Sequence, residues 1–242
     1  MTRRRTVADR LPMQLRHVAP VRHVDSADEL LRRRHVVSGA LGIGTAALGV
    51  SLSSEPGSRR FYLSTLGVAG IWTAGALTSG PLHRGWVQAR DLRLGRPVWT
   101  PVATGVGAFG FFVAVASVAT RAPRLHRAVA DILSFAERGN EGWVLATTLA
   151  NGVSEEMFFR GALYTALEGR RPAVTSTLTY AAVTASTRNP ALVAAATVMG
   201  GLFAVQRRAT GGLQAPLLTH LTWSALMVRC FPRIYRWLVA RR

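Results

Sequence analysis

Two adjacent glutamates, Glu155 and Glu156, lie inside an otherwise apolar stretch, with Arg160 four residues after the second. Inside a bilayer an unpaired carboxylate is costly, so such residues usually face an internal hydrated cavity and carry function. Glu156 and Arg160 have the i, i+4 spacing, acid first, that favours an ion pair on a helix. Glu155 points about 100° away from that pair. We therefore expect Arg160 to neutralise Glu156, which leaves Glu155 as a candidate general base.

Other groups for acid–base chemistry are scarce in the second half of the chain. After Glu141 the glutamate pair is joined by only one further acidic residue, Glu168, at the end of the apolar stretch. His220 is the only histidine beyond His126. Any acid–base site inside the membrane must therefore draw on the glutamate pair, its arginine and His220.

The expected depth in the membrane brings distant residues together. At a rise of about 1.5 Å per residue, Glu155, Thr184 and His220 all fall near the middle or the cytoplasmic half of the bilayer. A shared cavity between their helices is therefore feasible. Tyr180 and Trp223, which lie nearby in the sequence, are interpreted as packing or interface aromatics.

These residues resemble the motifs of a known family. The pattern Glu155-Glu156-x-x-x-Arg160 matches the first motif of the CAAX-processing and bacteriocin-processing (CPBP, or ABI) intramembrane proteases. The stretch Tyr180–Thr184 lies where that family has Phe-x-x-x-His, and Thr219–Ser224 where it has His-x-x-x-Asn/Asp. The resemblance implies peptide hydrolysis inside the membrane.

Carried over from the family, the roles of four residues follow. The resemblance implies that Glu155 activates a water, that Glu156 and Arg160 support the site, and that His220 is an oxyanion or proton partner. No metal is needed for such a water-activating glutamate. We therefore expect a glutamate-type intramembrane endopeptidase with no cofactor.

Two positions depart from the family pattern. Thr184 replaces a histidine and Ser224 replaces an Asn/Asp, and their hydroxyls remain candidates for oxyanion or substrate support. Thr184 cannot replace a basic imidazole. A zinc site with the usual three protein ligands would need Glu155, Glu156 and His220 together, and adjacent helical residues converge poorly on one ion. A metal is thus possible but disfavoured.

Three other interpretations stay open beside the protease. The departures at Thr184 and Ser224 favour a catalytically degenerate relative that acts as a membrane scaffold or an immunity or partner protein. Glu155 could instead serve as a proton relay in a transporter. The glutamate–arginine cluster could also be an ion-pair lock between helices. The sequence identifies no substrate and no oligomeric state.

The composition is that of a polytopic membrane protein. The 242 residues are 49% hydrophobic and 17% charged, whereas soluble domains have about 25% charged residues. The net charge of +18 would suggest nucleic acid on a soluble fold, but the arginines fall between apolar runs, as in loops at an anionic membrane surface. The expected partners are therefore the lipid bilayer and a peptide or protein substrate in it, and no nucleic acid. The single Cys230 excludes an internal disulfide.

The apolar runs predict an all-α, multi-pass integral membrane protein with about seven to eight transmembrane helices plus interfacial helices. The runs are Val36–Leu52, Phe61–Ser79, Val98–Ala119, Trp143–Leu167, Ala173–Thr187, Ala191–Val205 and Leu213–Val228. The fifth and sixth runs are shorter than the roughly 20 residues of a span. Arg188-Asn189-Pro190 separates them, which predicts a helical hairpin.

Charge predicts the orientation and the interfacial segments. With the N-terminus cytoplasmic in the cell membrane, the Arg-rich segments 81–97, 168–171 and 207–212 lie inside, although the basic 121–141 loop then lies outside. Amphipathic patterns predict interfacial helices at 127–138 and in the C-terminal tail.

The start of the chain shows two further signals. Ser26 followed by Glu29 predicts a capping box. Arg32-Arg33-Arg34 before the first run resembles a twin-arginine export signal, but the later runs favour an ordinary first span with a basic flank. The predicted organisation is a basic, partly disordered cytoplasmic tail (1–35), N-terminal transmembrane helices (36–97), a CPBP-like core (98–230) and an amphipathic tail (231–242).

Overall fold

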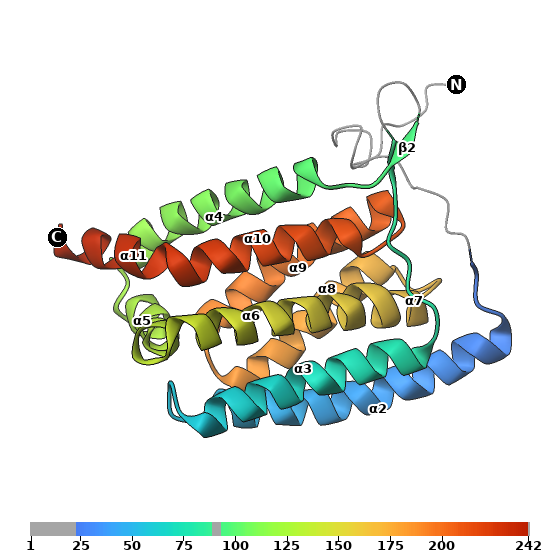
Figure 1. Ribbon diagram of the computed structural model, residues 1–242, viewed down its shortest axis with the longest axis horizontal. Helices are drawn as coiled ribbons and strands as arrows, with labels where there is room; N and C mark the ends of the chain where they lie inside the picture. The colour runs from blue at the N-terminus through green and yellow to red at the C-terminus, as the bar shows by residue number, and fades with distance from the viewer. Residues whose placement is uncertain (1–22, 89–92, 242) are drawn as a thin grey trace.

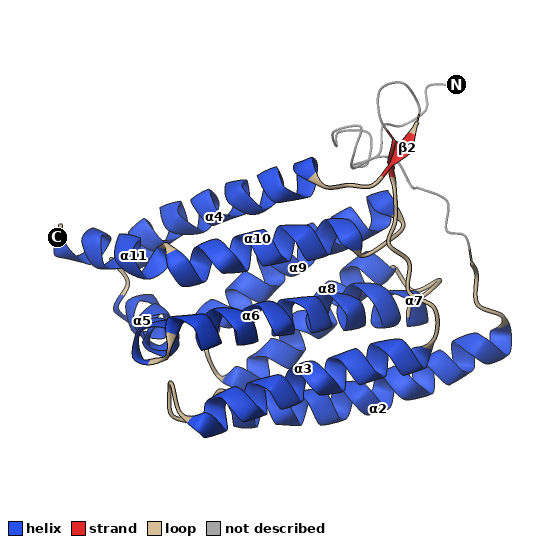
Figure 2. Cartoon of the chain, viewed as in Figure 1, coloured by secondary structure: helices blue, strands red, loops and turns tan. Residues whose placement is uncertain are grey.

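The computed structural model describes residues 23–88 and 93–241 (Figure 1). Their secondary structure is helical apart from one short antiparallel ladder, in which Val87 pairs with Gly95 (Figure 2). The all-α prediction is therefore confirmed for the described residues. The disorder predicted for the first part of the N-terminal tail falls on residues 1–22, which lie outside them.

The helices follow one another through mostly short connections. They are α2 (Ala27–Ser51), α3 (Arg59–Ser79), α4 (Trp99–Ala119), α5 (Pro123–Arg138), α6 (Glu141–Glu155), α7 (Tyr164–Ala166), α8 (Pro172–Thr184), α9 (Pro190–Thr210), α10 (Gln214–Arg229) and α11 (Phe231–Ala240). A π-helical segment, η2 (Glu156–Leu163), joins α6 to α7, and a 3₁₀ turn, η3 (Ala185–Thr187), follows α8. The strands are β1 (Val87–Gln88) and β2 (Leu94–Gly95).

Helix α6 occupies the centre of the bundle. It packs between α3 and α10, and these helices run along the long axis of the molecule with α2 and α4 (Figure 1). The hairpin of α8 and α9 passes behind α6 in this view. Trp72 of α3 packs on Phe158 and Phe159 of η2, with ring centroids 4.5 and 5.2 Å apart. A Cβ on Gly44 of α2 would lie 2.3 Å from the Trp72 ring, so only glycine permits this approach of α2 and α3.

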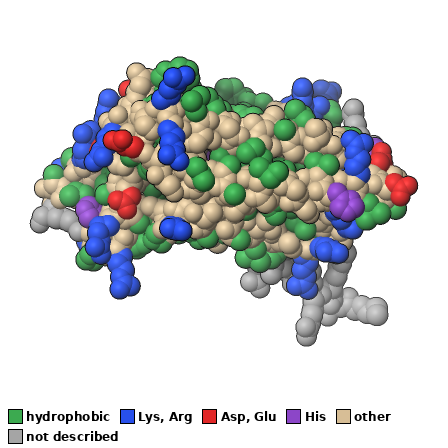
Figure 3. Space-filling view, turned by 90° about the horizontal axis from the view of Figure 1, so that it is seen from below, with side chains coloured by type: hydrophobic (Ala, Val, Ile, Leu, Met, Phe, Trp, Pro, Cys, Tyr) green, Lys and Arg blue, Asp and Glu red, His purple; other side chains and the backbone are tan. Residues whose placement is uncertain are grey.

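Three helices among the described residues are long and apolar enough to cross a membrane: α3, α4 and α9. The predicted count of seven or eight spans is therefore not confirmed. Helix α8 has 13 residues and α10 has 16, so at 1.5 Å per residue they reach roughly 20 and 24 Å, short of the roughly 30 Å hydrocarbon core. On the face in Figure 3, charged side chains gather toward the two ends, with an uncharged band between them.

Helix α2 begins earlier than the predicted boundary between tail and span at residue 35. The predicted capping box is confirmed, because Ser26 N donates to Glu29 Oε2 (2.8 Å) and Glu29 N donates to Ser26 Oγ (3.4 Å). From this cap, one helix continues through the three arginines to Ser51. Residues 27–35 are thus helical and continuous with the first apolar run.

The three consecutive arginines bind the ends of other helices. Arg32 Nη2 donates to Thr78 O (3.2 Å) at the end of α3, and Arg34 Nε donates to Ala166 O (3.0 Å) at the end of α7. The side chain of Arg33, the middle arginine of the three, is buried. Helix C-termini leave carbonyls without intrahelical partners, which guanidinium groups can satisfy. These arginines therefore tie α2 to α3 and α7.

The predicted hairpin at residues 188–190 is confirmed. Arg188 adopts a left-handed conformation (φ 57°), and Asn189 Oδ1 caps α9 by accepting from Ala191 N at 2.9 Å. Asn189 Nδ2 also donates to Ala128 O of α5 at 2.9 Å, which holds the turn against the amphipathic helix. Helix α9 then extends to Thr210, five residues beyond the predicted end of its run.

Both predicted amphipathic segments form helices whose apolar faces pack inward. In α5, Ala128 and Leu133 are buried, and in α11, Phe231 and Tyr235 are buried. His126 Nδ1 and Tyr235 Oη lie 2.8 Å apart and join the two helices. At this end of the molecule α5 and α11 lie close together (Figure 1).

Candidate active site

The glutamate pair lies at the point where the backbone changes its winding. Glu155 is the last residue of α6, and Glu156 is the first of the eight residues of the π-helical segment η2. Short π-helical segments inside α-helices are rare and occur frequently at functional sites. The sequence alone predicted an ordinary helix here, so the wider turn is a finding of the structure.

Glu156 is fully buried and has two cationic or polar partners. Its Oε1 lies 3.4 Å from Arg160 Nη1 and 2.9 Å from His220 Nδ1. The predicted pair with Arg160 is therefore present, and His220 is added to it across the interface between η2 and α10. The His220 ring stacks on Phe203 of α9 at 4.8 Å. Nδ1 of His220 is used by this contact, and Nε2 lies on the opposite edge of the ring.

Arg160 is held mainly by aromatic faces. Its guanidinium carbon lies 4.6 Å from the ring centroid of Tyr180, 5.1 Å from that of Phe203 and 5.9 Å from that of Phe159. Its Nε and Nη2 atoms are buried and have no hydrogen-bond partner among the described residues. Cation–π contacts of this kind stabilise a desolvated guanidinium without using its hydrogen-bond donors.

Glu155 has a different partner, as its direction on the helix predicted. Its Oε2 accepts a hydrogen bond of 2.6 Å from the Tyr180 hydroxyl on α8. Unlike Glu156, Glu155 keeps part of its surface accessible. Sequence reasoning had interpreted Tyr180 as a packing aromatic and missed this bond. The signal available was its position in the Phe-x-x-x-His stretch, where it adds a hydroxyl to the expected phenylalanine.

The remaining two candidates do not bond to the glutamates. Thr184 Oγ1 donates to Tyr180 O of its own helix at 2.8 Å. Ser224 is buried on α10, and no hydrogen bond joins it to Glu155 or Glu156 within the described part of the chain. The structure thus brings together four of the six predicted site residues, and oxyanion or substrate support by the other two stays a prediction.

Arg207 is a contact of the site that the sequence did not reveal. Its position was assigned to a cytoplasmic segment, 207–212, but it lies inside α9 and is buried. Arg207 Nε donates to Arg160 O at 2.7 Å, and its guanidinium lies 5.0 Å from the ring of Tyr164. The wider winding of η2 alters its backbone hydrogen bonding, and the Arg207 bond satisfies one of its carbonyls.

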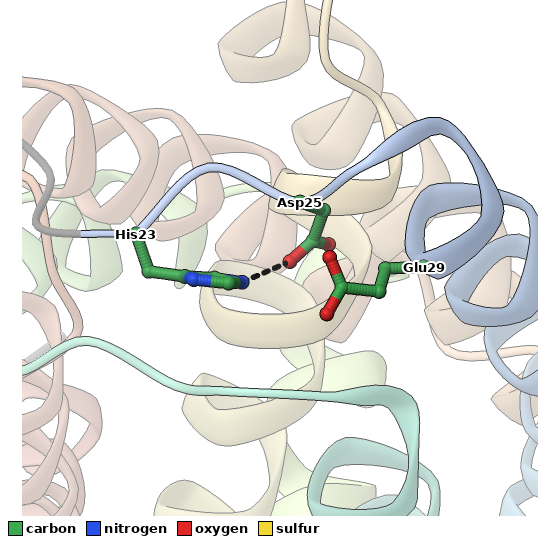
Figure 4. Close-up of side chains that lie close together, drawn as sticks. All are labelled: His23, Asp25 and Glu29. Atoms are coloured by element: carbon green, nitrogen blue, oxygen red, sulfur yellow. Dashed lines mark ion pairs between the residues drawn. The ribbon is translucent and has the colours of Figure 1, made fainter.

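A second cluster of metal-ligand types lies away from the glutamates. His23, Asp25 and Glu29 each offer a ligand atom, and these atoms lie within 4.8 Å of one another (Figure 4). Asp25 is already paired with Arg33 through both carboxylate oxygens, and Glu29 accepts from Ser26 in the cap of α2. The Arg33 hydrogen bond holds the pKa of Asp25 below its ordinary value. This cluster is therefore a helix cap with an ion pair.

The comparisons with known proteins agree with the motif analysis. Residues 139–226 match the family model of the Rce1-like type II CAAX prenyl endopeptidases. No curated protein and no solved structure matches the chain. The matched segment contains Glu155, Glu156, Arg160, Tyr180 and His220. The match agrees with the resemblance: residues 139–226 of this membrane protein, whose apolar helices are described above, are similar to the Rce1-like, CAAX-protease-like family.

Proposed function

We propose that this chain is a glutamate-type endopeptidase that hydrolyses peptide bonds in or near the membrane. The observation that carries the proposal is the difference between the two glutamates. Glu156 is 0% exposed and bound by Arg160 and His220, whereas Glu155 is partly accessible and, among the described residues, has a single side-chain hydrogen bond, to Tyr180. A general base must reach a water molecule, so Glu155 is the residue suited to that role.

The chemistry follows from these contacts. Glu155 takes a proton from water through the carboxylate oxygen that Tyr180 does not occupy, and the hydroxide attacks the scissile carbonyl carbon. The scissile C–N bond then breaks, and Glu155 gives the proton to the leaving amine. Glu156 orients the His220 ring through Nδ1, so that Nε2 faces away from it and can contact the reacting carbonyl or carry a proton. Arg160 pairs with Glu156 and holds its carboxylate in place. These roles require no metal.

The substrate is proposed at the level of chemistry only. The matched family is named for prenyl endopeptidases of CAAX proteins; for this chain we propose a peptide or protein segment presented from the bilayer, with lipid as the surrounding partner and no nucleic acid. The Arg-rich segments near residues 81–97 and 168–171 support a cytoplasmic N-terminus in the cell membrane.

The test is cleavage of quenched fluorescent peptides by the purified protein in proteoliposomes. Glu155→Gln should lower kcat/KM by about 10²- to 10⁴-fold, the usual contribution of a general base. Glu168→Gln is the matched control, because Glu168 is exposed at the end of α7 and its loss should leave the rate unchanged. Equal cleavage by wild type and Glu155→Gln would remove the assigned role.

A catalytically degenerate partner protein is the second candidate. It is favoured by Thr184, whose hydroxyl is used within its own helix and offers no imidazole to the site. Under this alternative the native protein cleaves nothing, and Thr184→His creates an activity. Cleavage by the native protein excludes it.

A further inference from the structure

We propose that Tyr180 is the residue that positions Glu155 in this chain, through a hydrogen bond from its hydroxyl to Oε2. The inference rests on the proposed function, which it deepens by assigning a residue that the motif analysis treated as packing. Tyr180 comes from α8, which lies behind α6 in Figure 1, whereas Glu155 ends α6, so the bond links side chains of two different helices.

The ring of Tyr180 is held by contacts that do not involve its hydroxyl. One contact is the guanidinium of Arg160, 4.6 Å from the ring centroid, and another is the ring of Phe159 at 4.8 Å. Tyr180 therefore links the two glutamates: its face contacts the arginine that pairs with Glu156, and its hydroxyl contacts Glu155. A change in the position of Glu155 therefore acts on the ring through its hydroxyl, and a change in the position of Glu156 acts on it through Arg160.

The neighbouring polar groups are occupied elsewhere. Thr184, one turn further on α8, donates to Tyr180 O, and His220 bonds to Glu156. Within the described residues, the Tyr180 hydroxyl is thus the group that hydrogen-bonds the Glu155 side chain. The other carboxylate oxygen, Oε1, accepts no hydrogen bond from the described residues, so under the proposed function it is the oxygen that takes the proton from water.

The length of the bond indicates what it does. At 2.6 Å it lies in the range of charge-assisted O–H···O⁻ bonds, which are stronger than neutral ones. Such a bond stops the carboxylate from rotating about its terminal torsion and holds Oε1 in one direction. A base fixed in this way needs no reorientation when the water and the peptide arrive, which contributes to rate and not to substrate binding.

The first experiment separates the hydroxyl from the ring. Tyr180→Phe keeps the aromatic contacts with Arg160 and removes only the hydrogen bond to Glu155. We expect kcat to fall by about 10- to 100-fold, the range of a hydrogen bond to a charged group, with KM within about twofold. Thr184→His in the Tyr180→Phe background should recover part of the loss by supplying a donor from the next turn of α8. An unchanged kcat for Tyr180→Phe overturns the inference.

Tyr62→Phe is the matched control. The Tyr62 hydroxyl accepts a hydrogen bond of 3.0 Å from Asn140 N, far along α6 from the glutamates. Its removal costs the fold a similar contact, so a merely structural role for Tyr180 predicts the same small effect for both variants. A loss of kcat equal in the two variants contradicts positioning.

A second measurement does not depend on proteolysis. Glu155 in the intact protein is labelled with a hydrophobic carbodiimide, and the modified peptide is quantified by mass spectrometry, with Glu155→Gln identifying the signal. Tyr180→Phe should raise the labelling rate several-fold because Oε2 loses its donor, while Tyr62→Phe should not. An equal rate in wild type and Tyr180→Phe overturns the inference. Faster labelling in a protein that never cleaves peptides supports the positioning and rejects the proposed function.

Discussion

Arg33 and Arg160 are two of the buried arginines of this bundle, and their guanidinium groups are bound in opposite ways. Arg33 on α2 is 1% exposed and Arg160 on η2 is 0% exposed. All three guanidinium nitrogens of Arg33 are used, on Asp25, on Ser79 Oγ (3.2 Å) and on Pro81 O (3.3 Å). Arg160 has one ion pair of 3.4 Å, and two of its nitrogens have no partner among the described residues.

The difference separates a structural cluster from a candidate functional one. Buried polar groups are usually fully hydrogen-bonded, and a group that is not requires an explanation. The hydrogen bonds of Arg33 join the start of α2, at Asp25, to the end of α3, at Ser79 and Pro81. Around Arg160 aromatic rings hold the charge, while its Nε and Nη2 atoms and Glu156 Oε2 have no hydrogen-bond partner among the described residues. Real proteins break local rules of this kind at functional sites.

The largest expected effect is a loss of stability when Arg33, whose guanidinium nitrogens are all hydrogen-bonded, is replaced. Arg33→Met removes the main partner of the Asp25 carboxylate and leaves it with His23 Nε2, 3.2 Å away, so we expect the free energy of unfolding to fall by about 3–5 kcal/mol. Unfolding in mixed detergent micelles measures it. Arg32→Met, at an exposed position on the same helix, is the control and should cost less than 1 kcal/mol. The cleavage rate per folded molecule should be unchanged for both variants. A lower rate per folded molecule in Arg33→Met alone would contradict a purely structural role for Arg33.

Arg160→Met should lower the cleavage rate more than it lowers the stability, the reverse of Arg33→Met. Glu156 keeps His220 as a partner, so the loss of stability should be smaller than for Arg33→Met. The rate should fall by about 100-fold, or about 2.7 kcal/mol, because Glu156 loses its ion pair and the Tyr180 ring loses its contact with the guanidinium group. Thermal unfolding and peptide cleavage of the same preparation give both values. A variant that is unstable but fully active when folded would place Arg160 with Arg33 as structural.

The smallest expected effect is the pH dependence of the stability that the Asp25–Arg33 pair contributes. The Arg33 hydrogen bond lowers the pKa of Asp25, so the stabilisation is complete above the unfolded-state pKa of about 3.9 and is lost as pH falls through the lower folded-state pKa. Asp25→Asn is less stable at neutral pH, and the gap to wild type should narrow below about pH 4. Melting temperatures of both proteins from pH 7 to pH 3 test it. A constant gap contradicts the assignment.

Sequence reasoning succeeded where the interaction is local. The capping box at Ser26 and Glu29, the hairpin turn at residues 188–190 and the pair of Glu156 with Arg160 each join residues at most four apart. Their geometry follows from helix periodicity and turn chemistry, which the local sequence carries. Span counting was less successful, because α8 and α10 are apolar but short, and apolarity alone does not measure length.

The sequence by itself determined the two glutamates, the arginine one turn later and the single histidine available to them, and with these the family that the 139–226 segment resembles. Only the tertiary structure decided which partner each group has. Tyr180 bonds to Glu155, His220 to Glu156, and Arg207 to the carbonyl of Arg160. The physical reason is that these contacts cross between helices and depend on the π-helical winding of η2, and no local pattern in the chain encodes either.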